Sequence, residues 1–330
     1  MFTTTPTLSE MHYNLRLQDL ISAQRVTPAP PHYHLTDATQ DLFQFMPQLL
    51  GKRAQEESWV AYLRQGRLCH LDPVAQGDLA YTPLTTFAIH QRTLCYQADG
   101  FYLFHNHPGG RPQHSLEDQA ATQRLMAIDR LMRFNFLGHL VVTPTGCYWP
   151  NGQLVVSGQS AVTAATPTSR WLDCQLDEKL QPIFAAHGPL HSAKAIANWA
   201  NFAVTHHGEF FDTPGSQRVI CYFNYDLTPV AWLPVRGDLT NDHVQQAISA
   251  GALLTNTQLL GQIIFAGLNV SPTQLDQQLQ AVVQEPVDWL NLLDIHLIDT
   301  IVSSTDFPAN TVTYATCSNG TSFPNLKIKA

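Results

Sequence analysis

The chain has 330 residues, of which 44% are hydrophobic and 10% are aromatic. This is enough apolar material for two folded domains, and it excludes disorder along the whole length. Charged residues make up only 13% and the net charge is −8, so a basic groove for a nucleic-acid backbone is not indicated.

Three features of the sequence predict the compartment. The six cysteines are widely spaced and none forms a CxxC pair, which favours free thiols in a reducing compartment. The amino terminus lacks a basic start followed by an apolar stretch, so no signal peptide is expected. No apolar run reaches about 18 residues, so no membrane-spanning helix is expected either. We therefore expect a soluble, cytoplasmic protein without a membrane partner.

The first half of the chain alternates between strand and helix patterns. Residues 1–30 are interpreted as an amino-terminal extension that ends in a Pro-rich linker, and residues 31–155 as a domain. The expected elements are a helix that begins near Thr36, strands at Trp59–Leu63 and Leu68–Leu71, a helix over 84–96, a strand at Phe101–Phe104, a helix at Glu117–Phe134 and a strand at Leu137–Val142. This alternation predicts an α/β sandwich.

The second half repeats this pattern after a connector over residues 156–186. The tripeptide at 237–239 repeats the Gly-Asp-Leu at 77–79 with a spacing of 160 residues, and the strand at 263–265 repeats the one at 102–104 with a spacing of 161. We interpret residues 187–308 as a second α/β domain that duplicates the first, and residues 309–330 as a tail.

Two histidines and an aspartate in the first domain have the spacing of a metal site. His105 and His107 stand at positions i and i+2 at the end of a strand, so their imidazoles point to the same side. Asp118, in the first turn of the next helix, can return to the same point. Two neutral imidazoles and one carboxylate leave a tetrahedral position open for water, as in catalytic zinc sites. Such a zinc lowers the pKa of the bound water toward about 7.

A hydrolase of this kind also needs a general base and a group that stabilises the oxyanion. The nearest upstream acids are Glu56 and Glu57, and spacing alone does not choose between them. The hydroxyl of Ser115 can donate to the oxyanion of a tetrahedral intermediate. The remaining histidines of this half are interpreted as ordinary polar residues: His70, His90, His114 and His139.

The string from His105 to Asp118 resembles the JAMM (MPN+/JAB) metalloprotease motif, because His-x-His-Pro is followed by Ser-x-x-Asp with seven residues between the second His and the Ser. The longer form, HNHPxG and SxxD after an apolar strand, is similar to the RadC-like branch of that superfamily over about residues 35–145. The resemblance implies a cytidine-deaminase-like α-β-α sandwich in which His105, His107 and Asp118 bind Zn²⁺ and Ser115 supports the oxyanion.

The resemblance also implies a base and an activity. Glu57 is the implied base, because this branch places a Glu two residues before an aromatic, here Trp59, and Glu56 remains open. The implied activity is zinc-dependent hydrolysis of a peptide or isopeptide bond in a protein substrate, with a ubiquitin-like conjugate as one candidate. The alternatives are a non-catalytic interaction module with structural zinc, and a RadC-like DNA-associated factor of a mobile element. The acidic balance of the chain counts against DNA.

The second domain departs from the motif. Aligned by its strand to within one residue, Ala266 and Leu268 stand in place of the two histidines, and Gln217 stands in place of the implied base. Only Asp276 echoes the aspartate of the motif. We therefore interpret this half as a degenerate, MPN−-like copy, and we expect the two halves to pair within one chain.

Overall fold

The computed structural model describes residues 39–64, 66–76, 86–132, 134–155, 181–182, 188–206, 217–235, 237–306 and 311–317. The chain divides into two units, Met1–Asp173 and Cys174–Ala330. The division falls inside the connector expected over residues 156–186. The extension at 1–30, the turn at 77–79 and most of the connector lie outside the described residues.

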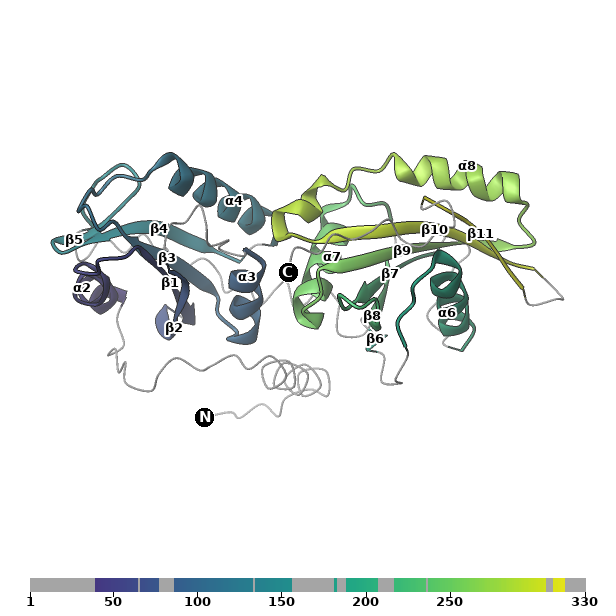
Figure 1. The fold of residues 1–330 in the computed structure, drawn as a ribbon, viewed down its shortest axis with the longest axis horizontal. Coiled ribbons are helices and arrows are strands. Elements are labelled where there is room, and N and C mark those ends of the chain that lie inside the picture. Colours follow the sequence, from purple (N-terminus) through teal and green to yellow (C-terminus); the bar gives the residue numbers. More distant parts are fainter. Residues whose placement is uncertain are drawn as a thin grey trace, which may run out of the picture. The chain divides into compact units, whose positions relative to one another are not determined.

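The first unit is built on a five-stranded mixed sheet (Figure 1). Its described elements in chain order are α2 (Thr39–Leu50), β1 (Glu57–Arg64), β2 (Arg67–Gln76), α3 (Thr86–Cys95), β3 (Gly100–Asn106), α4 (Leu116–Met132), β4 (Phe136–Thr143) and β5 (Gly146–Tyr148). The strand order is β2-β1-β3-β4-β5. β3 and β4 are parallel, because α4 carries the chain back between them, and the other neighbouring strands are antiparallel.

Apolar side chains on both faces of this sheet explain why helices cover both sides. Leu42, Met46 and Leu50 of α2 belong to one buried cluster with Trp59 and Phe104 of the sheet. Figure 1 shows α2 and α4 on opposite sides of β3 and β4. Because side chains alternate along a strand, the residues between these sheet positions face the other side. All seven residues of β3 are buried, as expected for the central strand of an α-β-α sandwich.

The second unit repeats the order and the directions of these five strands. Its described elements are β6 (Gln181–Pro182), α6 (Ala193–His206), β7 (Gln217–Phe223), β8 (Pro229–Val235), α7 (Asp242–Thr255), β9 (Leu259–Leu268), α8 (Pro272–Val283), the 3₁₀ helix η3 (Asp288–Leu293), β10 (His296–Asp306) and β11 (Thr311–Thr316). The sheet order is β11-β10-β9-β7-β8-β6, so β8-β7-β9-β10-β11 corresponds to β2-β1-β3-β4-β5, with β9 and β10 as the parallel pair. Figure 1 shows α6 and α8 on opposite sides of this sheet. This topology confirms the predicted fold class of two tandem α/β units.

Each unit contains an equivalent hydrogen bond from a tyrosine, and this pair of bonds defines how the strands of the two units correspond. The hydroxyl of Tyr62 in β1 donates to a backbone carbonyl of α3, and the hydroxyl of Tyr222 in β7 donates to a backbone carbonyl of α7. Tyr62 is paired with Phe101 of β3, and Tyr222 with Leu260 of β9. A residue of β3 therefore corresponds to the residue of β9 that lies 159 positions later.

Two boundaries differ from the sequence expectation in ways that matter for the site. The central strand continues to Asn106, so His105 is a strand residue, and the long helix begins at Leu116.

None of the helices in the described part of the chain is long and apolar enough to cross a membrane.

Candidate metal centre

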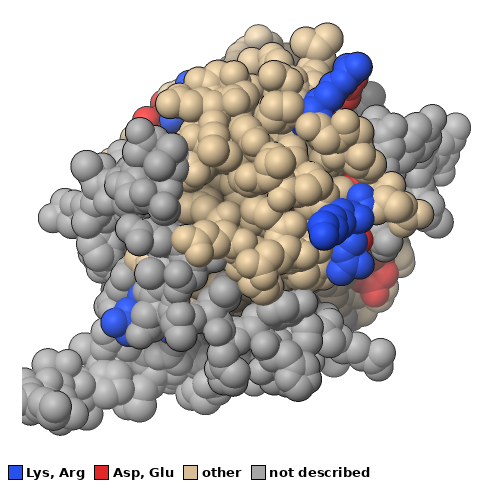
Figure 2. Space-filling model, turned by 90° about the vertical axis from the view of Figure 1, so that its left-hand side faces the viewer, with Lys and Arg blue, Asp and Glu red and all other residues tan. Residues whose placement is uncertain are grey.

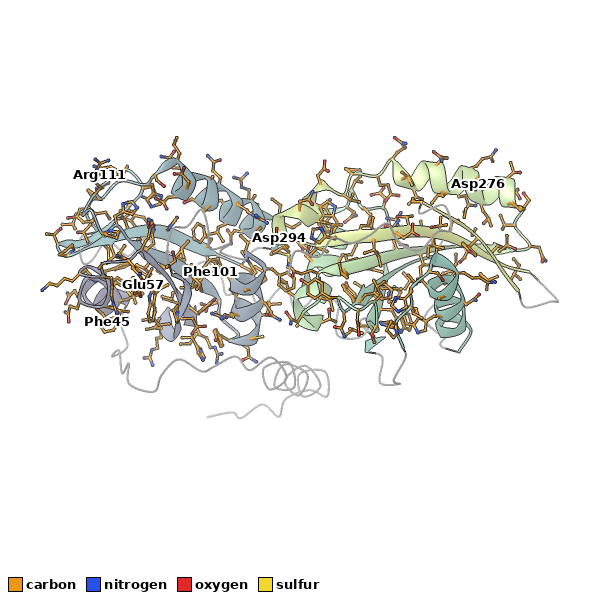
Figure 3. The ribbon with its side chains drawn as sticks, viewed as in Figure 1. Phe45, Glu57, Phe101, Arg111, Asp276 and Asp294 are labelled. Carbon is orange, nitrogen blue, oxygen red and sulfur yellow. The ribbon has the colours of Figure 1, made fainter. Side chains whose placement is uncertain are left out.

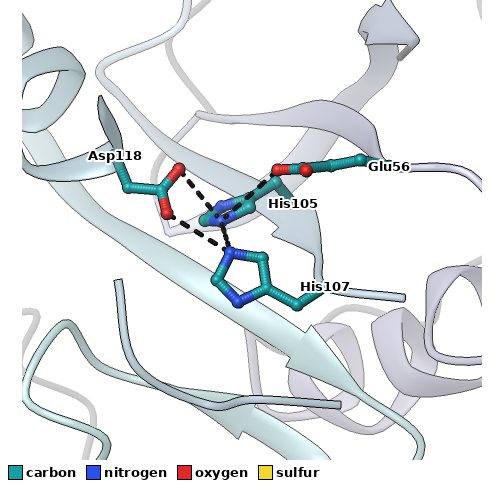
Figure 4. A group of neighbouring side chains, drawn as sticks. All are labelled: Glu56, His105, His107 and Asp118. Carbon is teal, nitrogen blue, oxygen red and sulfur yellow. Dashed lines mark hydrogen bonds and ion pairs between the residues drawn. The ribbon is translucent and has the colours of Figure 1, made fainter. Parts of the chain in front are cut away.

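The carboxyl end of β3 and the amino end of α4 bring four potential metal ligands together (Figure 4). His105 lies in β3, His107 follows the strand, and Asp118 lies in the first turn of α4. Glu56, immediately before β1, completes the group. One ligand atom from each of the four residues lies within 4.8 Å of all the others.

The three motif residues have the separations of ligands around one small cation. Nε2 of His105 lies 2.9 Å from Nε2 of His107 and 3.2 Å from Oδ1 of Asp118. Nε2 of His107 lies 3.3 Å from Oδ2 of Asp118. Ligands at about 2.0–2.1 Å from a tetrahedral ion lie roughly 3.3 Å apart. Oδ1 of Asp118 is buried and makes no hydrogen bond with the described residues, so a cation is a partner that fits it.

The electrostatics of the cluster suit a cation. Burial by itself raises the pKa of Asp118, but the imidazoles of His105 and His107 outweigh this and hold the pKa well below its usual range. The pKa of His105 is lowered, chiefly by burial and also by the neighbouring His107, although Asp118 acts to raise it. The pKa of His107 is raised, chiefly by its contact with Asp118 and against the effect of burial. An imidazole binds a cation through a ring nitrogen that carries no proton, so we expect cation binding to depend on pH.

The ring nitrogens of His105 and His107 that point away from the cluster also have hydrogen-bond partners. Nδ1 of His107 donates to the backbone carbonyl of Arg111 at 2.8 Å. A carbonyl can only accept, so Nε2 of this ring keeps its lone pair for the cluster. Nδ1 of His105 lies 2.8 Å from Nε2 of His139 in β4. Contacts of this kind orient imidazole ligands in metal sites.

Asp118 and Ser115 are positioned by the start of α4. Oγ of Ser115 accepts a hydrogen bond from the backbone N–H of Asp118 at 3.1 Å, and Oδ2 of Asp118 accepts one from the backbone N–H of Ser115 at 2.8 Å. This reciprocal pair is a capping box, which satisfies two N–H groups that the first helical turn leaves without partners. Ser115 is exposed, so a substrate can reach its hydroxyl.

Glu56, rather than Glu57, faces the cluster. Oε1 of Glu56 lies 4.0 Å from Nε2 of His105. Ser58 is paired with His105 across β1 and β3, so the two side chains share a face of the sheet, and Glu56 is on that face by alternation. The Glu57 carboxylate is on the opposite face, where it accepts from the indole N–H of Trp59 at 3.2 Å (Figure 3). The residue assigned as base from the resemblance thus lies outside the cluster, and the alternative that was left open lies in it.

Two histidines interpreted from the sequence as ordinary polar residues lie beside the cluster. His139 is 1% exposed and contacts His105, and the ring centroid of His114 lies 4.4 Å from that of His139. Burial lowers the pKa of His114 to about 4 and also lowers that of His139. The sequence did contain a signal for this contact of His139. The residue lies inside an apolar strand, and a buried imidazole needs a polar partner.

Comparison with known families agrees with this geometry. Residues 36–149 match the family model described as the RadC-like JAB domain. These residues form a RadC-like JAB domain. The predicted membership of the RadC-like branch of the JAMM superfamily is therefore confirmed for the first unit.

The JAB domain is similar to bacterial proteins named UPF0758 protein. The relative from Flavobacterium johnsoniae is 24% identical over 140 residues, which cover 42% of this chain and 57% of the relative. The relative from Porphyromonas gingivalis is 27% identical over 121 residues (36% and 53%), and that from Delftia acidovorans is 36% identical over 96 residues (29% and 42%). The chain spans about half the length of the curated relatives it matches. Their name states no reaction.

The second unit has the strand positions of the JAB domain without its imidazoles. By the correspondence of 159 residues, Ile264 and Ala266 occupy the positions of His105 and His107. The sequence alignment placed the histidines on Ala266 and Leu268, two residues too far, because the apolar runs of β3 and β9 match in more than one register. Neither residue in the corrected register can bind a metal through its side chain.

The start of α8 shows which residue of the second unit corresponds to Asp118. Ser271 caps α8 and forms a capping box with Gln274, so Gln274 corresponds to Asp118 of the JAB domain. Asp276, which was matched to Asp118 from the sequence, lies two residues further along α8 (Figure 3). Among the described residues of the second unit, no three His, Cys, Asp or Glu side chains are grouped as metal ligands.

Proposed function

We propose that this chain is a zinc-dependent hydrolase of the JAMM type that cleaves a peptide or isopeptide bond. The observation that carries the proposal is the ligand geometry: His105, His107 and Asp118 converge at tetrahedral separations, and the Glu56 carboxylate lies just beyond them. Two imidazoles and one carboxylate are the donors of catalytic zinc sites, which keep one position open.

The residues of the site have separate roles in this proposal. Zinc, when bound, supplies a Lewis acid and makes water a better nucleophile at neutral pH. His105, His107 and Asp118 hold the ion. Glu56 takes a proton from the attacking water and delivers it to the leaving amine, as a general base and then a general acid. The exposed hydroxyl of Ser115, which accepts from the helix backbone, uses its own hydrogen to donate to the oxyanion of the substrate.

The surface supports a protein or peptide substrate over DNA. The side of the molecule at the left of Figure 1, where α2 and β5 lie, is mostly uncharged in the part drawn in colour, with a few basic and acidic side chains toward its margins (Figure 2). DNA binding draws on phosphate contacts from clustered Lys and Arg, and the net charge of the chain is −8. A ubiquitin-like conjugate is the substrate class to test first. The buried free thiols Cys95, Cys147 and Cys221 suit the cytoplasmic setting that belongs to this proposal.

The second unit has a different role in the proposal. It keeps the strand order of the first unit but has Ile264, Ala266 and Gln274 at the ligand positions. Such a unit can bind a partner or the first unit without doing chemistry. Pairing of the two units stays a prediction, and independent stability of both halves after limited proteolysis would count against it.

Metal analysis and cleavage assays on the full chain test the proposal together. We expect about one zinc per chain, because one of the two units has the ligands, and loss of that zinc in Asp118→Ala. The matched control is Asp276→Ala, which alters the second unit and should keep the zinc. Hydrolysis would be measured on peptides and on isopeptide-linked ubiquitin-like conjugates. Zinc-free wild-type protein, or cleavage that persists in zinc-free Asp118→Ala, would refute the proposal.

A further inference from the structure

A chain of three hydrogen bonds leads from the metal cluster back to the helix that carries Asp118. Nδ1 of His105 lies 2.8 Å from Nε2 of His139, and Nδ1 of His139 lies 2.8 Å from Oγ1 of Thr122. The hydroxyl of Thr122 in turn donates to the backbone carbonyl of Asp118 at 2.7 Å. His105 and His139 are at most 1% exposed, so little water can substitute for these partners.

The direction of every hydrogen bond in this chain follows from its last member. The carbonyl of Asp118 can only accept, so the single hydrogen of the Thr122 hydroxyl is used there. Oγ1 of Thr122 must then accept from His139, which places the hydrogen of His139 on Nδ1. Nε2 of His139 is left as an acceptor, so Nδ1 of His105 donates to it. A neutral His105 therefore has its hydrogen on Nδ1 and a lone pair on Nε2, the atom that faces His107.

We infer that Thr122 and His139 are positioning residues that set the tautomer of His105 for metal binding. In the opposite tautomer, the N–H of His105 would point from Nε2 at His107 and would block coordination. The arrangement differs from that of His107, whose outer nitrogen donates directly to the carbonyl of Arg111. His105 has an imidazole instead of a carbonyl as its acceptor, and an imidazole can also donate. A third group is needed to choose the direction. Thr122 supplies it, beside the backbone carbonyl of Asp118, to which His139 also donates.

The helix places Thr122 where this role requires it. Thr122 follows Asp118 by four residues in α4, so the two lie on the same face of the helix. The same turn of α4 thus supplies a metal ligand, through Asp118, and the residue that orients another ligand, through Thr122. The inference rests on the metal site of the proposed function, and outer partners of histidine ligands typically change metal affinity about 10–100-fold.

Conservative substitutions at Thr122 test the inference. Thr122→Val keeps the shape but removes the hydroxyl, and we expect zinc affinity, measured by competition with a chromophoric chelator, to fall about 10–100-fold. Thr122→Ser keeps the hydroxyl and should bind within a few-fold of wild type. The matched control is Thr93→Val, because the Thr93 hydroxyl makes the same bond to a carbonyl one turn earlier, in α3, without a histidine. The control should leave zinc affinity unchanged.

A second measurement reads the tautomer directly in the metal-free protein. Nitrogen-15 chemical shifts of the His105 ring should show the hydrogen on Nδ1 in wild type and in Thr122→Ser, and a mixture of tautomers in Thr122→Val. A hydrogen on Nε2 of His105 in wild type would overturn the inference, and so would Thr122→Val binding zinc as tightly as Thr93→Val. Failure of the wild type to bind zinc would instead refute the proposed function, so the two failures are distinguishable.

Discussion

The side-chain oxygen of Asn106 accepts a hydrogen bond from the backbone N–H of Glu57 at 2.8 Å. The amide nitrogen of the same side chain donates to the carbonyls of Arg53 and Gln55, at 3.3 Å and 3.0 Å. Asn106 is 1% exposed and stands between the two histidines of the cluster. Its amide therefore holds both sides of the short segment that carries Glu56, and it ties the position of the proposed base to the strand that carries the ligands.

Replacement of Asn106 should affect catalysis more than metal binding. In Asn106→Ala the segment before β1 loses three hydrogen bonds, so Glu56 is no longer held at one place. A displacement of about 1 Å in a catalytic group can cost roughly 100-fold in rate, and we expect kcat to fall about 10–100-fold. Zinc content, measured alongside, should stay near that of wild type. An unchanged kcat in a zinc-loaded variant would show that the clamp has no catalytic role.

The two neighbouring glutamates should behave differently. Glu56→Gln removes the carboxylate that faces the cluster, and we expect kcat to fall by about 10²–10⁴-fold, the usual contribution of a general base. Glu57→Gln alters the opposite face of β1 and should stay within a few-fold of wild type. Both variants should keep zinc, which separates loss of the base from loss of the metal. An inactive Glu57→Gln beside an active Glu56→Gln would reverse the assignment.

In the proposed site Asp118 has two roles, as a metal ligand and as the acceptor for the N–H of Ser115, and a pair of variants can separate them. Asp118→Asn keeps an oxygen that can accept from the N–H of Ser115, so the cap of α4 is retained while the negative charge is lost. Asp118→Ala loses the charge and the acceptor for the N–H of Ser115, and keeps only the bond that the Ser115 hydroxyl accepts. We expect both variants to lose more than about 100-fold in zinc affinity, because each lacks the carboxylate ligand. Loss of a residue that only orients a ligand already lowers metal affinity about 10–100-fold. In chelator, Asp118→Asn should melt above Asp118→Ala, because Asp118→Ala loses the hydrogen bond from the N–H of Ser115, and one hydrogen bond contributes about 1 kcal/mol. Equal melting temperatures would argue that the capping bond contributes nothing.

The proposed ligands could be selected from the sequence, whereas the carboxylate that faces them from the start of β1 could not. His105, His107 and Asp118 are recognisable because a strand end and a helix start are close in sequence, so spacing alone reports their proximity. The choice of Glu56 depends on the pairing of Ser58 with His105 across two strands, which local spacing does not contain. Neighbouring residues of a strand point to opposite faces, so the step from Glu57 to Glu56 changes the face of the sheet. The resemblance selected Glu57, whereas Glu56 lies on the face of His105, and the identity of the base stays a prediction.

The contact between His139 and His105 needed tertiary information as well. It depends on the parallel pairing of β4 with β3, in which Leu103 is opposite His139. The duplicated strand order could be anticipated from the repeated pattern, but the register of β9 could not. Runs such as those of β3 and β9 are apolar at nearly every position, so they give no signal at a period of two residues.

A buried histidine far from the proposed catalytic chemistry predicts the pH dependence of stability in the first unit. His90 is 0% exposed and packs against Phe101 and Phe134, and burial lowers its pKa to about 4. In the unfolded chain a histidine has a pKa of about 6.5. Above pH 6.5 the ring is neutral in both states, so its contribution to stability is fully present. Below pH 6.5 the unfolded chain takes up a proton that the folded unit cannot, and stability is lost until the pH reaches about 4.

The titration of His90 should give the stability of the first unit a measurable slope against pH. A single such histidine costs about 1.4 kcal/mol of unfolding free energy per pH unit, or roughly 2 kcal/mol between pH 6.5 and 5. We expect this loss in the hydrogen exchange of the slowest β3 amides of metal-free protein, which report on the first unit alone. His90→Leu, which cannot titrate, should show a loss smaller by about that amount, and the buried His114 should account for part of the remainder. Identical losses in wild type and His90→Leu would mean that His90 is protonated in the folded unit.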